Sequence, residues 1–276
     1  MANVGETSGF PFLKRPARAH KPRTRGVTVA LDWARSINDA ESYVETVGDI
    51  VDHMKLTDHI GLMFRYSPDY IKRKNAIYAK AGIDTLPGGV VFEMAAVQGK
   101  VPELMARTRE LGFGAVEVSA DCIDFPADYR RAAIRLGVEN GLKVFTEIGK
   151  KSPDKPLDVK EAVDTAMADI DVGAEMVVIE KSDVELVMRN STDTLHRVVE
   201  AISPDKVIIE CGPGDNRFQI AAWLIKEFGM NVNLENVDAH EVFAIEAMRH
   251  GFHRAMGFSY FHEFAGKNMP PLAKKT

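Results

Sequence analysis

The sequence has few of the residues from which disulfide-rich folds and zinc sites are built. It contains two cysteines, Cys122 and Cys211, and no Cys-x-x-Cys pair in 276 residues, which excludes a zinc knuckle and disfavours a disulfide framework. No apolar run approaches the roughly 20 residues that a membrane helix needs, and the amino terminus lacks an apolar signal segment. We therefore expect a soluble cytoplasmic protein without a membrane partner.

A strong excess of one charge sign is also lacking, since the formal net charge is −5 and the isoelectric point is about 5.9. A nucleic-acid partner is therefore not expected. One basic stretch, KRPARAHKPRTR, occupies residues 14–25. It is typical of a solvated, poorly ordered arm; the alternative is that Arg23 or Arg25 folds over an anionic ligand or a neighbouring subunit.

Two common binding motifs are missing as well. No Gly-x-Gly-x-x-Gly follows an apolar run, which disfavours a doubly wound nucleotide-binding sheet, and no His-x-His or His-Glu-x-x-His pattern is present. The chain instead alternates Val- and Ile-rich runs, apolar on both faces, with amphipathic stretches of helical length. This alternation predicts strands at residues 27–32, 52–56, 84–87, 115–119, 143–148, 176–180, 206–211 and 231–235, and helices at residues 39–51, 68–81, 98–111, 126–140, 158–172, 191–202, 217–228 and 240–250.

The expected helices carry start and stop signals. Ser67 followed by Pro68 is typical of a helix start. At the other end, a glycine in a left-handed conformation commonly terminates a helix and lets the next strand begin. Five junctions have this pattern, at Gly82, Gly112, Gly141, Gly173 and Gly229.

Eight strand–helix units in succession predict an α/β fold of the (β/α)₈ TIM-barrel type. We expect an amino-terminal arm at residues 1–25, a barrel domain at residues 26–251 and a carboxyl-terminal tail at residues 252–276. In such a barrel the active site lies at the carboxyl ends of the strands. Side chains at those ends are therefore the candidates for function.

Acidic residues stand at or near the ends of the expected strands. Burying several carboxylates together is costly unless a cation is present, and Mg²⁺ is a hard ion that accepts such ligands. The alternative for any single acid is a structural ion pair with a lysine or an arginine. The predicted metal ligands are Glu117, Glu147, Glu180 and Glu210, and Asp32 at the end of the first strand is predicted to contact the substrate.

Lysines and glycines supply the other parts of a site. The stretch TEIGKK, residues 146–151, places two lysines at a strand end, where an ammonium group can donate a proton or stabilise negative charge. We predict that Lys150 points inward. The turn that contains Gly88 and Gly89 can bring backbone N–H groups close to an anion. His59 follows Lys55 and is the histidine expected at the active face.

The ordered motifs resemble the phosphosulfolactate synthase family. The resemblance implies a TIM barrel that adds sulfite to phosphoenolpyruvate with Mg²⁺, a step toward coenzyme M, in a homo-oligomer. Heat-stress-associated plant proteins resemble the same family, so a non-catalytic barrel protein is an alternative. The matching stretches cover most of residues 25–251: RGVTVALD, PGGVVFE, ELGFGAVEVS, GLKVFTEIGKKSPDK, VGAEMVVIE, KVIIEC and VNLENVDAHEVFAIEAMRHG.

The implied chemistry assigns roles to these residues. Sulfite would add to C3 of the enolpyruvate, charge would develop on the carboxylate, and an acid would protonate C2. The expected catalytic residues are Lys55, Lys150 and Glu147. The expected contacts with a small anionic substrate, besides Asp32, are Gly88, Gly89, Lys181, Arg217 and Asn233.

Four loops depart from the family's pattern, all at positions where a barrel selects its substrate. KLTDHIGLMF replaces a glycine-rich stretch after the second strand, and EKSDVELVM lacks an arginine and glycines after the sixth. SADC follows the fourth strand, and ECGPGDNR, after the seventh, loses a lysine but gains Arg217. The alternative activity is therefore a lyase on the same scaffold that acts on a different, non-phosphorylated unsaturated carboxylate or sulfonate.

Overall fold

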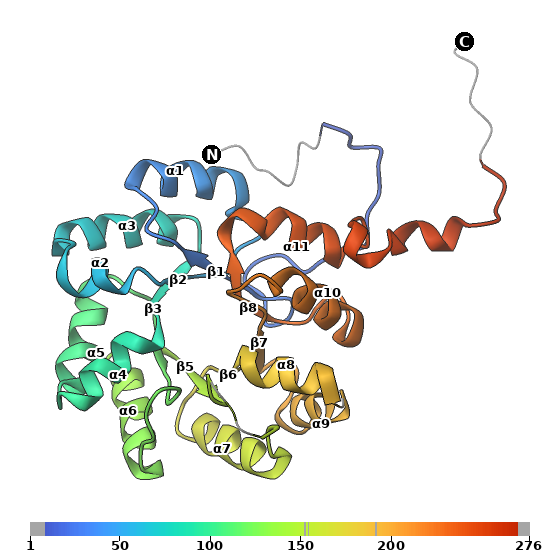
Figure 1. Cartoon of the computed structure of the whole chain (residues 1–276). Helices are drawn as coiled ribbons and strands as arrows, with labels where there is room; N and C mark the ends of the chain where they lie inside the picture. The colour runs from blue at the N-terminus through green and yellow to red at the C-terminus, as the bar shows by residue number, and fades with distance from the viewer. Residues whose placement is uncertain (1–8, 152, 154, 191, 270–276) are drawn as a thin grey trace.

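The computed structural model describes residues 9–151, 153, 155–190 and 192–269. Within them, parallel strands surround a central axis and helices cover the outside (Figure 1). This is the predicted (β/α)₈ barrel. The eight strands are β1 (Thr28–Asp32), β2 (His53–Leu56), β3 (Asp84–Pro87), β4 (Ala115–Val118), β5 (Lys143–Ile148), β6 (Met176–Ile179), β7 (Val207–Glu210) and β8 (Leu234–Asp238).

The strands hydrogen-bond in the order β3-β2-β1-β8-β7-β6-β5-β4. The regular ladder therefore breaks between β3 and β4, where one backbone hydrogen bond spans the gap: the amide of Gly114 donates to the carbonyl oxygen of Thr85 at 3.1 Å. Inside the barrel, apolar side chains such as Phe145 and Ile208 form a buried cluster. The charged residues described below lie above that cluster, at the carboxyl ends of the strands.

The helices match the predicted amphipathic stretches closely, with additions. The additional helices α2, α4 and α8 lie within βα loops, each between a strand and the predicted helix that follows it. The helices are α1 (Ile37–Val47), α2 (His59–Phe64), α3 (Pro68–Lys80), α4 (Gly89–Val97), α5 (Val101–Glu110), α6 (Ala127–Glu139), α7 (Val159–Asp171), α8 (Lys181–Asn190), α9 (Asp193–Ile202), α10 (Arg217–Phe228) and α11 (Val242–Arg249), with 3-10 turns η1 (Ala239–Glu241), η2 (Arg254–Met256) and η3 (Ser259–Phe264).

Two local predictions have clear outcomes. The five junction glycines, Gly82, Gly112, Gly141, Gly173 and Gly229, all have positive φ, between 65° and 113°, as the predicted left-handed turns require. The last strand, however, lies at Leu234–Asp238 rather than at residues 231–235. The sequence placed this strand too early because polar Glu235 and Asn236 interrupt its apolar pattern toward the carboxyl end of the barrel.

The basic arm is packed against the barrel over its described part. Lys21 Nζ donates to the carbonyl oxygens of Gly48 at 2.8 Å and Val51 at 2.5 Å, and Arg23 Nε donates to both carboxylate oxygens of Asp52 at 3.0 Å. These partners lie in the loop that leads into β2, at the amino end of the barrel. The arm therefore covers the end opposite the predicted active site, instead of lying free in solvent.

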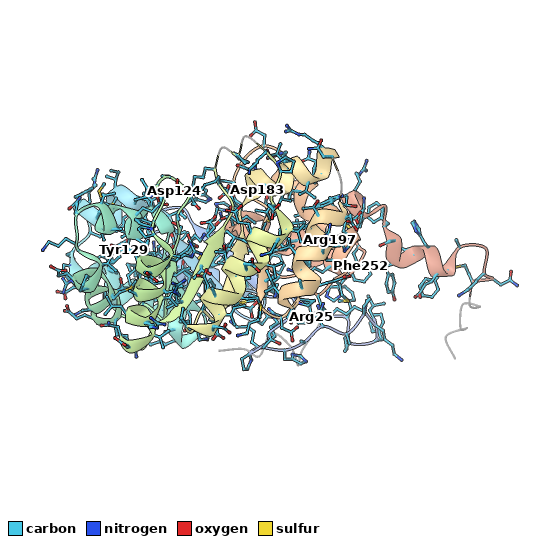
Figure 2. The ribbon with its side chains drawn as sticks, turned by 90° about the horizontal axis from the view of Figure 1, so that it is seen from below. Arg25, Asp124, Tyr129, Asp183, Arg197 and Phe252 are labelled. Atoms are coloured by element: carbon cyan, nitrogen blue, oxygen red, sulfur yellow. The ribbon has the colours of Figure 1, made fainter. Side chains whose placement is uncertain are left out.

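The side view separates the two ends of the barrel. In Figure 2, Asp124 and Asp183 lie at one edge, in or beside loops that follow strands, and Arg25 lies at the other edge beside the amino-terminal segment. The tail from η2 to η3 projects away from the barrel beyond α11 (Figure 1). In the described part of the chain, no helix combines the length and the apolar character needed to cross a membrane.

Candidate active site

A cavity of about 460 Å³ opens at the carboxyl ends of the strands. Lys55, Glu117, Glu147, Glu180 and Glu210 all line it. The barrel therefore brings together the four predicted metal ligands and one predicted catalytic lysine from five different strands or strand ends. Other lining residues include Leu31, Trp33, Thr57, His59, Gly88, Gly89, Lys151, Lys181, Ser182 and Asn236.

Lys55 stands at the centre of a buried carboxylate cluster. Its Nζ lies 2.6 Å from Glu117 Oε2, 3.1 Å from Glu235 Oε1 and 3.7 Å from Glu210 Oε1. The Lys55 side chain is 5% exposed and its three partners are 5% exposed or less. Glu117, Glu210 and Glu235 thus form structural ion pairs, the alternative to metal binding that the sequence allowed, and all three pair with one lysine.

The cluster sets the protonation of its members. Burial alone would lower the pKa of Lys55, but Glu117, Glu235 and Glu210 together raise it well above its ordinary value. Lys55 is therefore a fixed positive charge. Burial raises the pKa of Glu235 to about 7, against the opposing effect of Lys55. Burial, with the charges of Glu210 and Glu117, also holds the pKa of Glu147 well above its ordinary range.

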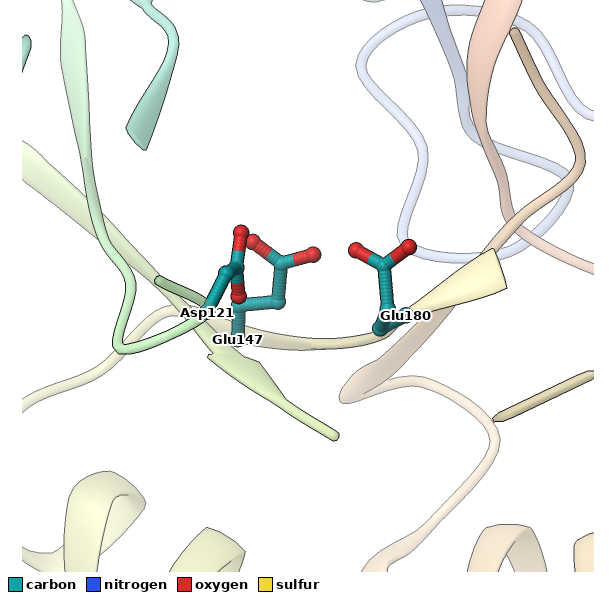
Figure 3. Close-up of side chains that lie close together, drawn as sticks. All are labelled: Asp121, Glu147 and Glu180. Atoms are coloured by element: carbon teal, nitrogen blue, oxygen red, sulfur yellow. The ribbon is translucent and has the colours of Figure 1, made fainter. Parts of the chain in front are cut away.

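A second group of carboxylates lies beside the first. Asp121, Glu147 and Glu180 each offer an oxygen within 4.8 Å of the others, and their carboxylates point toward one another (Figure 3). Asp121 Oδ1, Glu147 Oε1 and Glu180 Oε2 are buried without a hydrogen-bond partner among the described residues. Buried carboxylate oxygens without donors are the ligands that a hard divalent cation requires, so this group fits Mg²⁺.

Glu93 holds the loop that carries Asp121. From α4, its carboxylate accepts the Ser119 hydroxyl at 2.9 Å and the backbone N–H groups of Asp121 and Ile123, each at 3.1 Å. The loop after β4 is thereby tied to the helix after β3, across the break in the sheet ladder. Asp121 is consequently placed beside Glu147 by contacts that nearby sequence does not reveal.

The TEIGKK turn decides which lysine enters the cavity. Gly149 has a φ of 107°, a left-handed conformation that favours glycine, and the Lys150 amide donates to Asp183 Oδ2 at 2.9 Å. Lys150 Nζ then reaches outward to Asp124 Oδ1 at 2.5 Å. Lys151 lines the cavity, where its Nζ donates to Asp121 and lies 3.8 Å from Glu180 Oε2. The inward lysine is therefore Lys151, which corrects the prediction of Lys150.

Three predicted substrate contacts lie at the cavity, and two of them, Gly89 and Lys181, already contact protein carboxylates. Gly88 and Gly89 line it, but the Gly89 amide donates to Glu117 Oε1 at 2.8 Å. Lys181 also lines it, with Nζ 2.6 Å from Glu185 Oε1. A fourth contact, Arg217, begins α10 outside the described lining, and it forms an ion pair with Glu241 at 2.6 Å.

Two predicted substrate contacts, Asp32 and Asn233, lie away from the cavity. Asp32 ends β1 but faces the helices outside the barrel, where it accepts Lys74 Nζ at 2.9 Å and the Tyr78 hydroxyl at 2.7 Å. The alternation of side chains along a strand explains this, because Leu31 is the neighbour that faces the cavity. Asn233 lies at the opposite end of the barrel, where its side chain bonds the Val27 amide at 2.9 Å.

Three site residues were not predicted in these roles. Asp121 lies in the SADC stretch, three residues beyond the end of β4, and Lys151 is the second of two adjacent lysines. Glu235 follows the pattern of acids in strands, which was the available signal for it. Their roles depend on loop geometry and on neighbouring strands, which a single sequence does not contain.

The fold and the site together define a (β/α)₈-barrel enzyme with buried carboxylates and a buried lysine at the carboxyl ends of its strands. The chain belongs to the (2R)-phospho-3-sulfolactate synthase family, whose model matches residues 16–254. This match confirms the predicted family and, with it, an enzyme of the lyase class.

Individual relatives agree with the family match. The phosphosulfolactate synthase of Methanocaldococcus jannaschii is 34% identical over 82% of this chain and 92% of its own length. That of Methanothermobacter thermautotrophicus is 29% identical over 88% and 95%. A heat-stress-associated protein of Arabidopsis thaliana is 21% identical over 86% and 90%, so the predicted second resemblance is also found.

Solved structures support the fold. A dihydrodipicolinate synthase from Cyanidioschyzon merolae, with lysine bound, superposes with a TM-score of 0.52 at 13% sequence identity. The alignment covers 87% of this chain and 80% of that one. At this identity the likeness establishes the barrel architecture alone.

Proposed function

We propose that this chain catalyses the Mg²⁺-dependent addition of sulfite to phosphoenolpyruvate, giving (2R)-phospho-3-sulfolactate. The observation that carries the proposal is the group formed by Asp121, Glu147 and Glu180, whose carboxylates converge and each keep one buried oxygen without a hydrogen-bond donor among the described residues. Membership of the phosphosulfolactate synthase family and the names of the similar archaeal enzymes supply the reaction.

Asp121, Glu147 and Glu180 would hold the cation, with Glu117 and Glu210 beside them in the Lys55 cluster. When bound, Mg²⁺ would supply an electrophilic centre that stabilises negative charge on a substrate carboxylate. This revises the predicted ligand set, since Glu117 and Glu210 each approach Lys55. Burial and neighbouring acids raise the pKa of Glu147. A bound cation would stabilise its ionised form, which supports Glu147 as a ligand.

The lysines provide charge and a proton. Sulfite sulfur forms the new bond to C3, the electrons of the C2–C3 double bond move toward the carboxylate, and one proton is delivered to C2. Lys151 lies among Asp121 and Glu180 and is the candidate donor. Lys55 is held protonated by its three glutamates and stabilises the accumulating charge. His59 also lines the cavity, and burial lowers its pKa, so it is neutral near pH 7.

A second candidate function is supported by the ion pairs that the lysines of the cavity already form with protein carboxylates. Lys55, Lys151 and Lys181 each contact a carboxylate, and no arginine is found among the described lining residues. A phosphate group usually binds to arginine, to lysine or to free backbone N–H groups. This arrangement favours a non-phosphorylated unsaturated carboxylate or sulfonate as the alternative substrate of the same lyase chemistry.

We further propose that the enzyme works in the cytoplasm. Cys122 and Cys211 are unpaired, which suits a reducing cytoplasm. We also propose association with further copies of the same chain and a small anionic substrate. Gel filtration with light scattering tests the assembly state.

The reaction test uses purified protein, Mg²⁺, sulfite and phosphoenolpyruvate, with mass spectrometry of the products. The expected result is the phosphosulfolactate adduct, formed only when metal is present and lost in Glu147→Gln. An adduct formed from a non-phosphorylated enoate but not from phosphoenolpyruvate would support the second candidate. Folded protein that forms no adduct with either substrate would contradict both.

A further inference from the structure

A second large cavity lies at the amino end of the barrel, opposite the active site. Its volume is about 970 Å³, and it is enclosed by the basic arm, by α1 with the loop after it, and by α11 with the segment that follows. Arg15, Arg18, Lys21 and Arg23 line it from the arm. This size is at the upper end of the range for small-molecule sites, and the proposed reaction makes no use of it.

The cavity has a surplus of positive charge. Its four arm cations are opposed in the lining by Asp49 and Glu246. Just behind the lining, Asp52 pairs with Arg23 and the buried Arg249 adds another cation. In the lining and just behind it, five cations therefore accompany three acids, although the whole chain carries a net charge of −5. Burial lowers the pKa of Arg249, and the nearby charge of Arg18 lowers it further.

Arg18 has unused hydrogen-bonding capacity. Its side chain is 4% exposed, its Nε lies 2.8 Å from Glu246 Oε2 and its Nη1 donates to the Gly26 carbonyl oxygen at 2.9 Å. Its Nη2 is buried and donates to no acceptor among the described residues. A buried guanidinium N–H without an acceptor costs free energy that an anionic ligand would recover.

The walls of the cavity combine fixed and apolar parts. Lys21 and Arg23 bind backbone carbonyl groups and Asp52, so the arm is held in place over the barrel. Phe243, which is 56% exposed, and Phe252 form an apolar side of the lining. A bare inorganic ion would leave that side without a contact, whereas the body of an organic molecule would cover it.

We propose that this cavity binds a small organic anion, with phosphate or carboxylate groups bound by Arg18 and Arg15 and an apolar body against Phe243 and Phe252. The site lies at the opposite end of the barrel from the catalytic carboxylates. It therefore provides a binding function that is independent of which substrate the active site uses.

Matched probes test the recognition of charge. The binding of 1-naphthyl phosphate, 1-naphthoate and uncharged 1-naphthol to the full chain is measured by isothermal titration. We expect one site per chain, with at least about tenfold tighter binding of an anionic probe than of naphthol, because hydrogen bonds to charged groups have this strength. The two anionic probes distinguish a phosphate ligand from a carboxylate ligand.

Variants locate the site. Arg18→Met is expected to weaken binding of the anionic probe by at least about tenfold. The rim variant Arg15→Glu should weaken it by as much, and it is the variant to use if Arg18→Met does not fold. The side chain of Arg15 is 61% exposed, so we expect this variant to fold, and circular dichroism checks it. Arg25→Gln, on the same arm but outside this lining, and Lys151→Met, in the active site, are expected to bind as the unmodified chain does. Naphthol binding as tightly as the anions, no saturable binding of either anion, or undiminished binding in Arg15→Glu and Arg18→Met would each overturn the proposal.

Discussion

Lys55 Nζ, on β2, lies 2.6 Å from Glu117 Oε2, on β4. The contact passes over β3 and joins the two sides of the break in the barrel's hydrogen-bonded ladder. Glu235 on β8 and Glu210 on β7 approach the same ammonium group. One lysine therefore connects strands that have no direct ladder between them, and it compensates three buried acids.

Replacing this lysine is expected to destabilise the barrel. Lys55→Met leaves Glu117, Glu210 and Glu235 buried without their cation, which costs about 3–5 kcal/mol when one partner of a buried pair is removed. The loss should be larger at pH 8 than at pH 5, because protonation relieves the uncompensated carboxylates. Urea unfolding measures the free energy. Lys150→Met, which breaks an exposed pair with Asp124, is the control and should cost about 1 kcal/mol or less.

The unfolding free energy should fall with rising pH because of Glu235. Its pKa is raised from 4.5 to about 7 by burial, so its contribution is fully present below the unfolded value and is lost as pH rises through about 7. Glu235→Gln should flatten the pH dependence between these values, by on the order of 3 kcal/mol. Denaturant unfolding from pH 4.5 to pH 8 measures this, and the exposed Glu45→Gln should leave the profile unchanged. Equal slopes in Glu235→Gln and the unmodified chain would contradict the expectation.

The two neighbouring lysines should behave differently in catalysis. Lys151→Met removes the ammonium group that faces Asp121 and Glu180, and should lower kcat/KM by at least about 100-fold, as loss of a proton donor or charge stabiliser does. Lys150→Met should keep most of the activity, because its side chain points away from the cavity. Steady-state kinetics of the adduct-forming reaction, on variants shown to be folded, decides between them. Greater loss in Lys150→Met would return the catalytic role to that residue.

Asp32 should contribute to stability and not to substrate binding. Its carboxylate accepts hydrogen bonds from the buried Lys74 and Tyr78. Asp32→Asn is therefore expected to lower the free energy of unfolding by about 3–5 kcal/mol, because the Lys74 charge loses its partner. KM should be unchanged at a temperature where the variant is folded. The matched control is Asp84→Asn, whose pair with Lys143 is more exposed and should contribute about 1 kcal/mol or less. A raised KM with unchanged stability would show that Asp32 contacts the substrate.

Local patterns predicted the barrel because each of its units is specified locally. Val- and Ile-rich runs marked the strands, and glycines marked five helix ends, since burial on both faces and left-handed turns restrict the choice of residue. The eighth strand was displaced because Glu235 and Asn236 interrupt its apolar pattern. The loop helix α2 escaped the prediction because its 6 residues are too few to show a period, and α4 because it is apolar on nearly every side. Length does not explain the omission of α8, which has 10 residues like the predicted α5 and α9.

The sequence by itself determined the architecture, the family and the presence of acids at the strand ends, because these depend on the order of residues along the chain. The tertiary structure alone decided which acids compensate Lys55 and which converge with Asp121, and it assigned the inward position to Lys151 rather than Lys150. Those outcomes depend on a turn at Gly149, on the loop held by Glu93 and on side-chain direction within β1 and β8. The contacts that fix them join residues far apart in the chain, such as the Lys150 amide with Asp183 and the Asp121 amide with Glu93, so only the folded barrel brings them together.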